Sequence, residues 1–256
     1  MNGEIKQLSS IVCCARKALY DNKDIEFTLN EGVRSIKFVF SSPFSIWGTT
    51  EAESVQKWYR ICQKRGLRDI KLLIPTATDR RHLLGFANTS QGVIVCFWEN
   101  GKVSYFSPLW DFGNKSNGWV VIYKEQSGAA MPKDEFTYSN KTEEFKAVLL
   151  DICAFAKKIN FPYFSNIFHN AYDGMCNFAK IAEHNVPEHI PDAFKGIYYA
   201  VDTADVFGAM MSWNDSPPWH AEERGLENEY NDLSDKLLKQ LRYHLMYVTN
   251  ECWQRN

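Results

Sequence analysis

The feature that most constrains this chain is a long amphipathic stretch near its C-terminal end, residues 226–252. Apolar residues recur there at gaps of three or four, a spacing that keeps one face of an α-helix turned inward and that no strand can follow. At about 1.5 Å per residue, such a helix is roughly 40 Å long, about the width of a domain. We therefore expect it to span the body of the fold. The apolar positions are Leu226, Tyr230, Leu233, Leu237, Leu241, Leu245, Val248 and Cys252, and the polar face carries Asn228, Lys236, Lys239 and Arg242.

The loop that leads into this helix has its own signals. Ser216 can cap a helix, and Pro217 suits the first helical position, where a missing N–H costs nothing. Trp213 and Trp219 flank the loop, and two interpretations of them stay open. Either the two rings fix the loop to the core, or they form an aromatic contact site. Under the second interpretation the binding residues are Trp213, Asn214, Asp215, Trp219 and His220.

Composition limits the classes of protein to consider. With 256 residues, 45% of them hydrophobic and 14% aromatic, the chain can build a packed core in one large or two small domains. The net charge is −2 and the basic residues are scattered, so we expect no nucleic-acid partner. Residues 1–20 are typical of an amphipathic helix rather than a signal peptide, and no apolar run is long enough to span a bilayer. We therefore expect no membrane partner. The seven cysteines are odd in number and lie in apolar patterns, which predicts reduced thiols and a cytoplasmic location.

The first part of the chain alternates between strand and helix patterns. A helix is expected over residues 2–21, followed by a hairpin of residues 25–29 and 36–40. Thr50 and Glu53 have capping-box spacing for a helix that ends before Gly66. A strand over residues 70–74 follows, and this strand–helix–strand order is compatible with a parallel crossover.

The middle of the chain is antiparallel β in character, and the last part is helical. Asn100-Gly101 predicts a tight hairpin between strands 93–98 and 102–106, and residues 119–123 are expected to form the next strand. Helices are then expected over 142–159, 161–181 and 192–211. The sequence thus predicts an α+β protein, with an antiparallel or mixed N-terminal sheet and flanking helices over 1–125, a linker-like stretch over 126–140, and a mostly helical region over 141–256 that ends in the long helix. The two regions form either two domains or one.

Acidic residues give one candidate for chemistry. Asp202 and Asp205 are three apart and so lie on one helical face. If the next helix packs antiparallel, Glu223 and Glu227 can face them, and such carboxylates would hold Mg²⁺. The pattern is similar to the acidic helices of all-α nucleoside triphosphate pyrophosphatases, but Glu227 comes one position too late for their Glu-Glu-x-x-Glu motif. The alternative is that these residues solvate the surface and complement a helix dipole.

The sequence contains no other recognisable catalytic or cofactor-binding motif. The histidines and cysteines fit no paired zinc-ligand spacing, and the glycines form no phosphate-binding loop. We therefore expect no cofactor, apart from Mg²⁺ if the acidic residues act. The remaining feature is a surplus of rings in the sheet region, where loops carry Trp47 and Trp110. Such rings are either core plugs or part of a recognition surface.

Three functional hypotheses follow, and whether the chain is an enzyme stays open among them. We favour a cytoplasmic, non-catalytic binding module that recognises a protein partner, as inhibitor or immunity proteins do, through its aromatic loops. The first alternative is an Mg²⁺-dependent phosphohydrolase or nucleotide pyrophosphatase that uses the helical carboxylates. The second is a sensor of a small ligand or nucleotide, with a pocket between sheet and helices.

Overall fold

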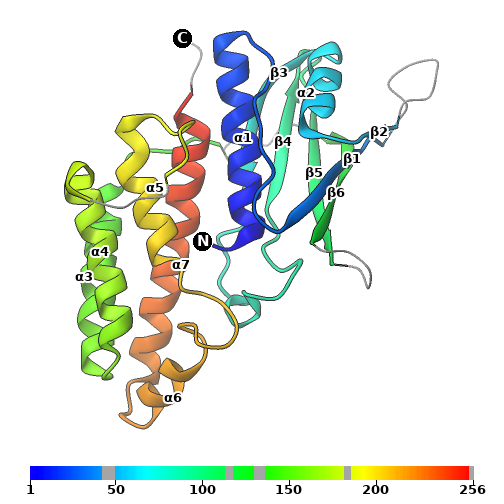
Figure 1. Cartoon of the computed structure of the whole chain (residues 1–256). Helices are drawn as coiled ribbons and strands as arrows, with labels where there is room; N and C mark the ends of the chain where they lie inside the picture. Colours follow the sequence, from blue (N-terminus) through cyan, green and yellow to red (C-terminus); the bar gives the residue numbers. More distant parts are fainter. Residues whose placement is uncertain (42–49, 113–117, 130–135, 182–185, 254–256) are drawn as a thin grey trace. The chain divides into compact units, whose positions relative to one another are not determined.

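A computed structural model describes residues 1–41, 50–112, 118–129, 136–181 and 186–253 (Figure 1). The chain divides into two compact units. The helical unit comprises Met1–Gly3, Pro75–Thr89 and Tyr138–Val248, and the sheet unit comprises Glu4–Ile74, Ser90–Thr137 and Thr249–Asn256. The expected α+β fold is confirmed, with a mixed sheet in the N-terminal half and helices that lie mostly in the C-terminal half.

The sheet has six strands among the described residues, in the order β2-β1-β6-β5-β4-β3. All neighbouring strands are antiparallel except β1 and β6, which run parallel. The strands are β1 (Val33–Val39), β2 (Glu51–Ala52), β3 (Leu67–Leu73), β4 (Val93–Trp98), β5 (Val103–Asp111) and β6 (Trp119–Ala129). The hairpin around Asn100-Gly101 is confirmed as β4 and β5, with Gly101 at a φ of 75°. Strand β6 continues into the first residues of the stretch that looked like a linker.

Two expectations for the first strands are wrong. Residues 25–29 form no strand, and β1 pairs instead with β2 and, in parallel, with β6. The strand–helix–strand order is not a parallel crossover either, because β1 and β3 are not neighbours in the sheet and run in opposite directions. Alternation of apolar and polar residues reports which face of a strand is buried, but it does not identify the neighbouring strand.

Two helices of the sheet unit, α1 (Gly3–Asp21) and α2 (Val55–Lys64), contribute to its core. Trp58 of α2 stacks on Phe38 of β1 with ring centroids 4.5 Å apart, and Phe38 stacks in turn on Tyr123 of β6. The Tyr123 hydroxyl donates to Oε1 of Gln7 in α1 over 2.8 Å. Helix α2 is capped by Ser54 rather than Thr50, because the chain just after Thr50 is used by strand β2.

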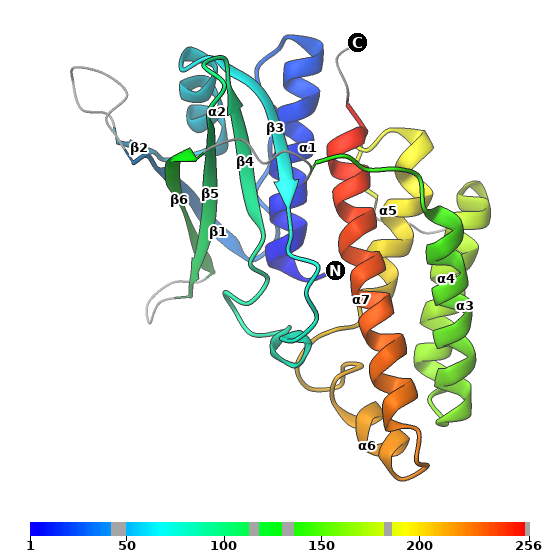
Figure 2. The same cartoon turned by 180° about the vertical axis from the view of Figure 1, so that it is seen from behind.

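The helical unit contains most of the remaining helices (Figure 2). Helix α4 packs against both α3 and α5, and glycines permit the approach, since a Cβ on Gly196 would lie 2.8 Å from the Gly174 carbonyl oxygen. Helix α5 ends at Ala204 instead of Met211, because the chain turns there and the Trp213 N–H bonds to the Val206 carbonyl over 3.0 Å. The elements are η1 (Arg81–Leu83), α3 (Thr142–Lys158), α4 (Pro162–Asn177), η2 (Phe178–Lys180), α5 (Asp192–Ala204), α6 (Ser216–Glu222) and α7 (Glu227–Glu251).

Helix α7 is the expected long terminal helix, and its apolar stripe is buried from Tyr230 onward. One position on its expected polar face is wrong. Arg242 is only 7% exposed, and its Nη1 donates to the carbonyl oxygens of Pro75 at 2.6 Å and Ala77 at 2.8 Å. Burial lowers the pKa of Arg242. Its guanidinium therefore satisfies backbone carbonyls of the segment that follows β3, a long-range contact that helical periodicity does not encode.

Candidate functional site

The loop before α6 is built around Trp213, which is fully buried. Its indole Nε1 donates to Oγ of Ser234 over 2.8 Å, and its ring lies edge-on to Phe164 and Phe168, with centroids 5.2 Å away in each case. The Tyr230 hydroxyl donates to the Trp213 carbonyl over 2.7 Å. Side chains from α4 and α7 thus hold this loop, and Trp213 itself belongs to the core.

Trp219, on α6, is placed very differently, with 56% of its surface exposed. It contacts the ring of His220 at 4.8 Å, and His220 packs edge-on against Phe161 at 4.9 Å. Phe161 contacts Phe164, and Phe164 contacts Tyr163, which is 68% exposed. We call Phe161, Tyr163, Phe164, Trp219 and His220 the aromatic surface. No local sequence pattern connects the first three with the last two, because their contact joins segments more than fifty residues apart.

The polar residues of the loop hold its shape. Asn214 accepts from Nη1 of Arg81 at 3.3 Å and donates from Nδ2 to the Arg81 carbonyl at 3.1 Å. Arg81 is itself fixed by an ion pair with Asp235 at 2.9 Å. Asp215 accepts from the backbone N–H of Met211 at 2.8 Å. The turn that Asp215 closes presents Met210 and Met211 to solvent, with 88% and 89% of their surfaces exposed.

The acidic candidates have separate partners. Oδ1 of Asp202 lies 3.0 Å from the amino group of Met1, and Oδ2 of Asp205 accepts from the Asn2 N–H at 2.8 Å. Burial raises the pKa of Asp205, and the nearby amino group opposes that rise. Glu223 lies 3.9 Å from Nδ1 of His220, and Glu227 is exposed in the first turn of α7. In the part of the chain that the structure describes, no three His, Cys, Asp or Glu residues form a group suited to a metal ion. An Mg²⁺ site stays a prediction.

Of the two tryptophans predicted as binding residues in the sheet region, the structure describes Trp110 alone. Trp47 lies outside the described residues. Trp110, on β5, is only 8% exposed and packs edge-on against Trp119 with centroids 5.9 Å apart. Phe112 packs on the same Trp119 ring at 5.1 Å and leaves 53% of its surface in solvent. A binding role for Trp47 and Trp110 stays a prediction.

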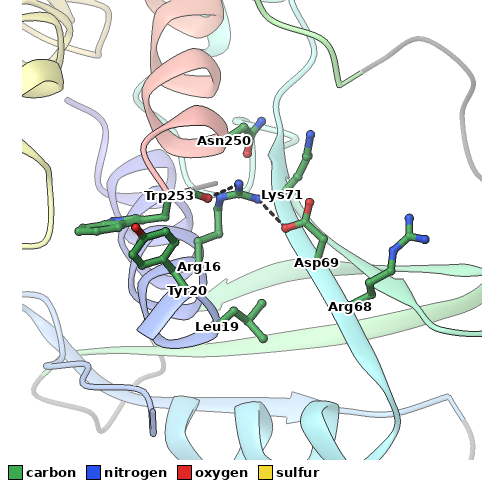
Figure 3. Close-up of a pocket in the computed structure, with 8 residues that line it drawn as sticks. All are labelled: Arg16, Leu19, Tyr20, Arg68, Asp69, Lys71, Asn250 and Trp253. Carbon is green, nitrogen blue, oxygen red and sulfur yellow. Dashed lines mark hydrogen bonds and ion pairs between the residues drawn. The ribbon is translucent and has the colours of Figure 1, made fainter. Parts of the chain in front are cut away.

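The sheet unit contains a pocket of about 340 Å³ (Figure 3). That volume falls within the range of small-molecule sites. Its walls come from α1, from strand β3 and from the end of α7 together with the residue pair that follows it. The residues that line it are Arg16, Leu19, Tyr20, Arg68, Asp69, Lys71, Asn250 and Trp253.

Arg16 forms the centre of this pocket and ties its walls together. Only 5% of its surface is exposed. Nη1 donates to Oδ1 of Asp69 at 2.6 Å and to the Ile70 carbonyl at 2.8 Å, and Nη2 donates to the Trp253 carbonyl at 2.5 Å. A buried guanidinium whose two terminal nitrogens bond to one carboxylate and two carbonyls is a rigid base for a site.

Strand β3 is an edge strand, and side chains cover part of its free backbone. The Asn250 amide accepts from the Leu72 N–H at 2.7 Å and donates to the Leu72 carbonyl at 2.9 Å. Arg16 occupies the Ile70 carbonyl. These bonds block the pairing of another strand along this part of the edge, so the pocket is suited to a small ligand rather than to an added strand.

None of the helices in the described part of the chain is both long and apolar enough to cross a bilayer.

Comparison of the chain with protein-family models, with curated proteins and with solved structures finds no match.

Proposed function

We propose that this chain is a non-catalytic binding module that recognises a protein partner, in the manner of an inhibitor or immunity protein, through the aromatic surface. The observation that carries the proposal is the contrast within one short segment. Trp213 is fully buried and fixed, whereas Trp219, six residues later, leaves 56% of its surface in solvent. Large exposed apolar side chains that cluster on one surface are typical of interaction sites.

The ring at the base of the aromatic surface is held in place before any partner arrives. Phe164, 5% exposed, packs against Trp213 below and against Phe161 and Tyr163 beside it. A ring with few rotatable bonds that is already oriented loses little entropy on binding, and Trp and Tyr are the most frequent energetic centres of protein interfaces. Met210 and Met211, exposed on the same segment, add flexible apolar contacts that adapt to a partner.

Charge near this surface indicates the chemistry of the partner. Asp215, Glu222, Glu223 and Glu227 are all exposed between the loop and the start of α7. Only Arg224 opposes them within the same short segment, 215–227. We infer a partner that offers an apolar depression for Trp219 and a rim of lysines or arginines. Such complementarity accelerates association at low salt.

The state of the cysteines supports a reducing compartment, and we propose a cytoplasmic location on that basis. All seven cysteines are free, and six of them are buried. Cys13 and Cys252 have sulfur atoms 3.9 Å apart without forming a disulfide. An odd number of unpaired cysteines without a repeated spacing is typical of proteins from reducing compartments.

Photo-crosslinking tests the proposal. A photoreactive phenylalanine analogue is placed at position 219 and, as the matched control, at position 112, because Phe112 has a similar exposed fraction of 53% but lies in the other unit. We expect one defined protein adduct from position 219 and none of that identity from position 112. The same adduct from both positions, or none from position 219, would contradict the proposal.

A further inference from the structure

The pocket around Arg16 has more cationic than acidic lining residues. Glu251 lies nearby, where burial raises its pKa and the charges of Lys71 and Arg16 oppose that rise. Of its lining residues three are cationic and one, Asp69, is acidic. Asp69 is paired with Arg16 at 2.6 Å. In the described parts of the chain, no carboxylate lies within ion-pair distance of Arg68 or Lys71. The pocket therefore offers to a ligand the Arg68 guanidinium and a second cation, the Lys71 ammonium, which also interacts electrostatically with Glu251.

A β-bulge places one of these groups. The register between β3 and β4 shifts between Leu67 and Asp69, so Arg68 is the additional residue and has no partner on β4. A bulge bends the strand and redirects a side chain, which is why bulges are frequent beside binding sites. Arg68 is exposed as a result. Lys71 follows on the same strand, is partly exposed, and donates from Nζ to the Phe136 carbonyl over 3.2 Å.

The other side of the pocket is aromatic. Tyr20 leaves 53% of its surface exposed, and its ring centroid lies 5.5 Å from that of Trp253. In the view of Figure 3, these two rings lie on one side of Arg16, and Arg68 and Lys71 lie on the other. The Arg16–Asp69 pair between them is fixed by its own hydrogen bonds.

We propose that this pocket binds a small anion that carries a planar ring, of the nucleoside monophosphate class. The phosphate would contact Arg68 and Lys71, because guanidinium and ammonium groups are the usual ligands of phosphate oxygens. The base would stack on Tyr20, since every base offers a π-face to an aromatic side chain. Arg16 is a positioning residue that holds the floor of the pocket and stays paired with Asp69. The site lies in the sheet unit and does not depend on the aromatic surface.

Calorimetric titration of the full chain with three probes tests the proposal. Adenosine monophosphate has both the phosphate and the ring, adenosine lacks the phosphate, and inorganic phosphate lacks the ring. We expect the monophosphate to bind more tightly than either fragment, and more weakly as salt increases. Arg68→Ala and Lys71→Ala should each weaken its binding by about tenfold, the loss expected when one charge-assisted hydrogen bond is removed.

Variants show which residues contact the phosphate of the ligand and which contact its ring. Tyr20→Ala should weaken adenosine monophosphate and adenosine but leave inorganic phosphate unchanged, whereas Arg34→Ala, at another exposed arginine of the same unit, should change nothing. All four positions are at the surface or partly exposed, and the melting temperature of each variant confirms its fold before titration. The proposal is overturned if adenosine monophosphate fails to bind at millimolar concentration, or if it binds equally to the wild type and to Arg68→Ala.

Discussion

Replacement of Trp213 by alanine should destabilise the helical unit severely. The side chain has no exposed surface and contacts rings from α3, α4 and α7. Truncation of a buried Trp to Ala costs about 3–5 kcal/mol of unfolding free energy, because burial is lost and a cavity remains. For a unit of this size, each kcal/mol lowers the melting temperature by roughly 2–4 °C, so we expect a fall of about 6–20 °C.

Two further variants separate the contributions to this loss. Trp213→Phe keeps a ring in the cavity but removes the Nε1–H that Ser234 accepts, and Ser234 is fully buried. We expect it to lose about 0.5–1.5 kcal/mol, the usual net contribution of one hydrogen bond, because the Ser234 hydroxyl keeps its hydrogen bond with Tyr230. Trp219→Ala should change the unfolding free energy by no more than about 0.5 kcal/mol, because exposed side chains contribute little to stability.

Urea unfolding followed by circular dichroism measures all three variants under one set of conditions. The expected order of stability is wild type and Trp219→Ala together, then Trp213→Phe, then Trp213→Ala. If Trp219→Ala were as unstable as Trp213→Ala, the ring of Trp219 would belong to the core. The distinction between a buried scaffold and an exposed contact ring would then be refuted.

Three more predictions follow from particular groups. Burial lowers the pKa of His244 below its ordinary 6.5, so the unfolded chain takes up the proton first, and the stability of the protein falls as the pH decreases from about 6.5 through the lower folded-state value. His244→Phe should therefore flatten the pH dependence of urea unfolding between about pH 7 and pH 5. An unchanged pH dependence would contradict this. A thiol reagent at mild alkaline pH should label one cysteine of the native protein, the exposed Cys176. The other cysteines are buried, and burial raises the pKa of Cys14 to about 12. Labelling that survives Cys176→Ser would show that a buried thiol is accessible. Addition of Mg²⁺ should leave the melting temperature unchanged, and a rise that Asp202→Asn abolishes would instead support the phosphohydrolase alternative.

Much of the fold could be predicted from local patterns in the sequence. The period of α7, the Asn100-Gly101 turn and the glycine after α2 each act within a few residues, so they are readable without knowledge of the rest. The pairing of β1 with β6 was not readable, because it joins segments more than eighty residues apart. Burial of Arg242 was missed for a similar reason, since its partners are carbonyl groups of a distant loop.

The candidate sites were predictable only in part. Trp219 and His220 could be predicted as contact residues because large rings beside a loop are unusual, and they do lie in a cluster with Phe161, the residue before α4. The cationic pocket was missed entirely, since Arg16 and Arg68 lie on different elements and neither forms a motif. A single basic residue on a helix or an edge strand is ordinary in sequence, and its meaning depends on the bulge and the buried ion pair that only the fold supplies.

The most direct test of the proposed function is the affinity of the chain for the protein cross-linked at position 219. The dissociation constant is measured for the wild type, for Trp219→Ala and for the matched variant Phe112→Ala. We predict that Trp219→Ala weakens binding by roughly thirtyfold, the loss of an interface centre worth about 2 kcal/mol, and that Phe112→Ala binds like the wild type. Equal affinity of the wild type and Trp219→Ala would contradict the claim that this surface recognises a partner.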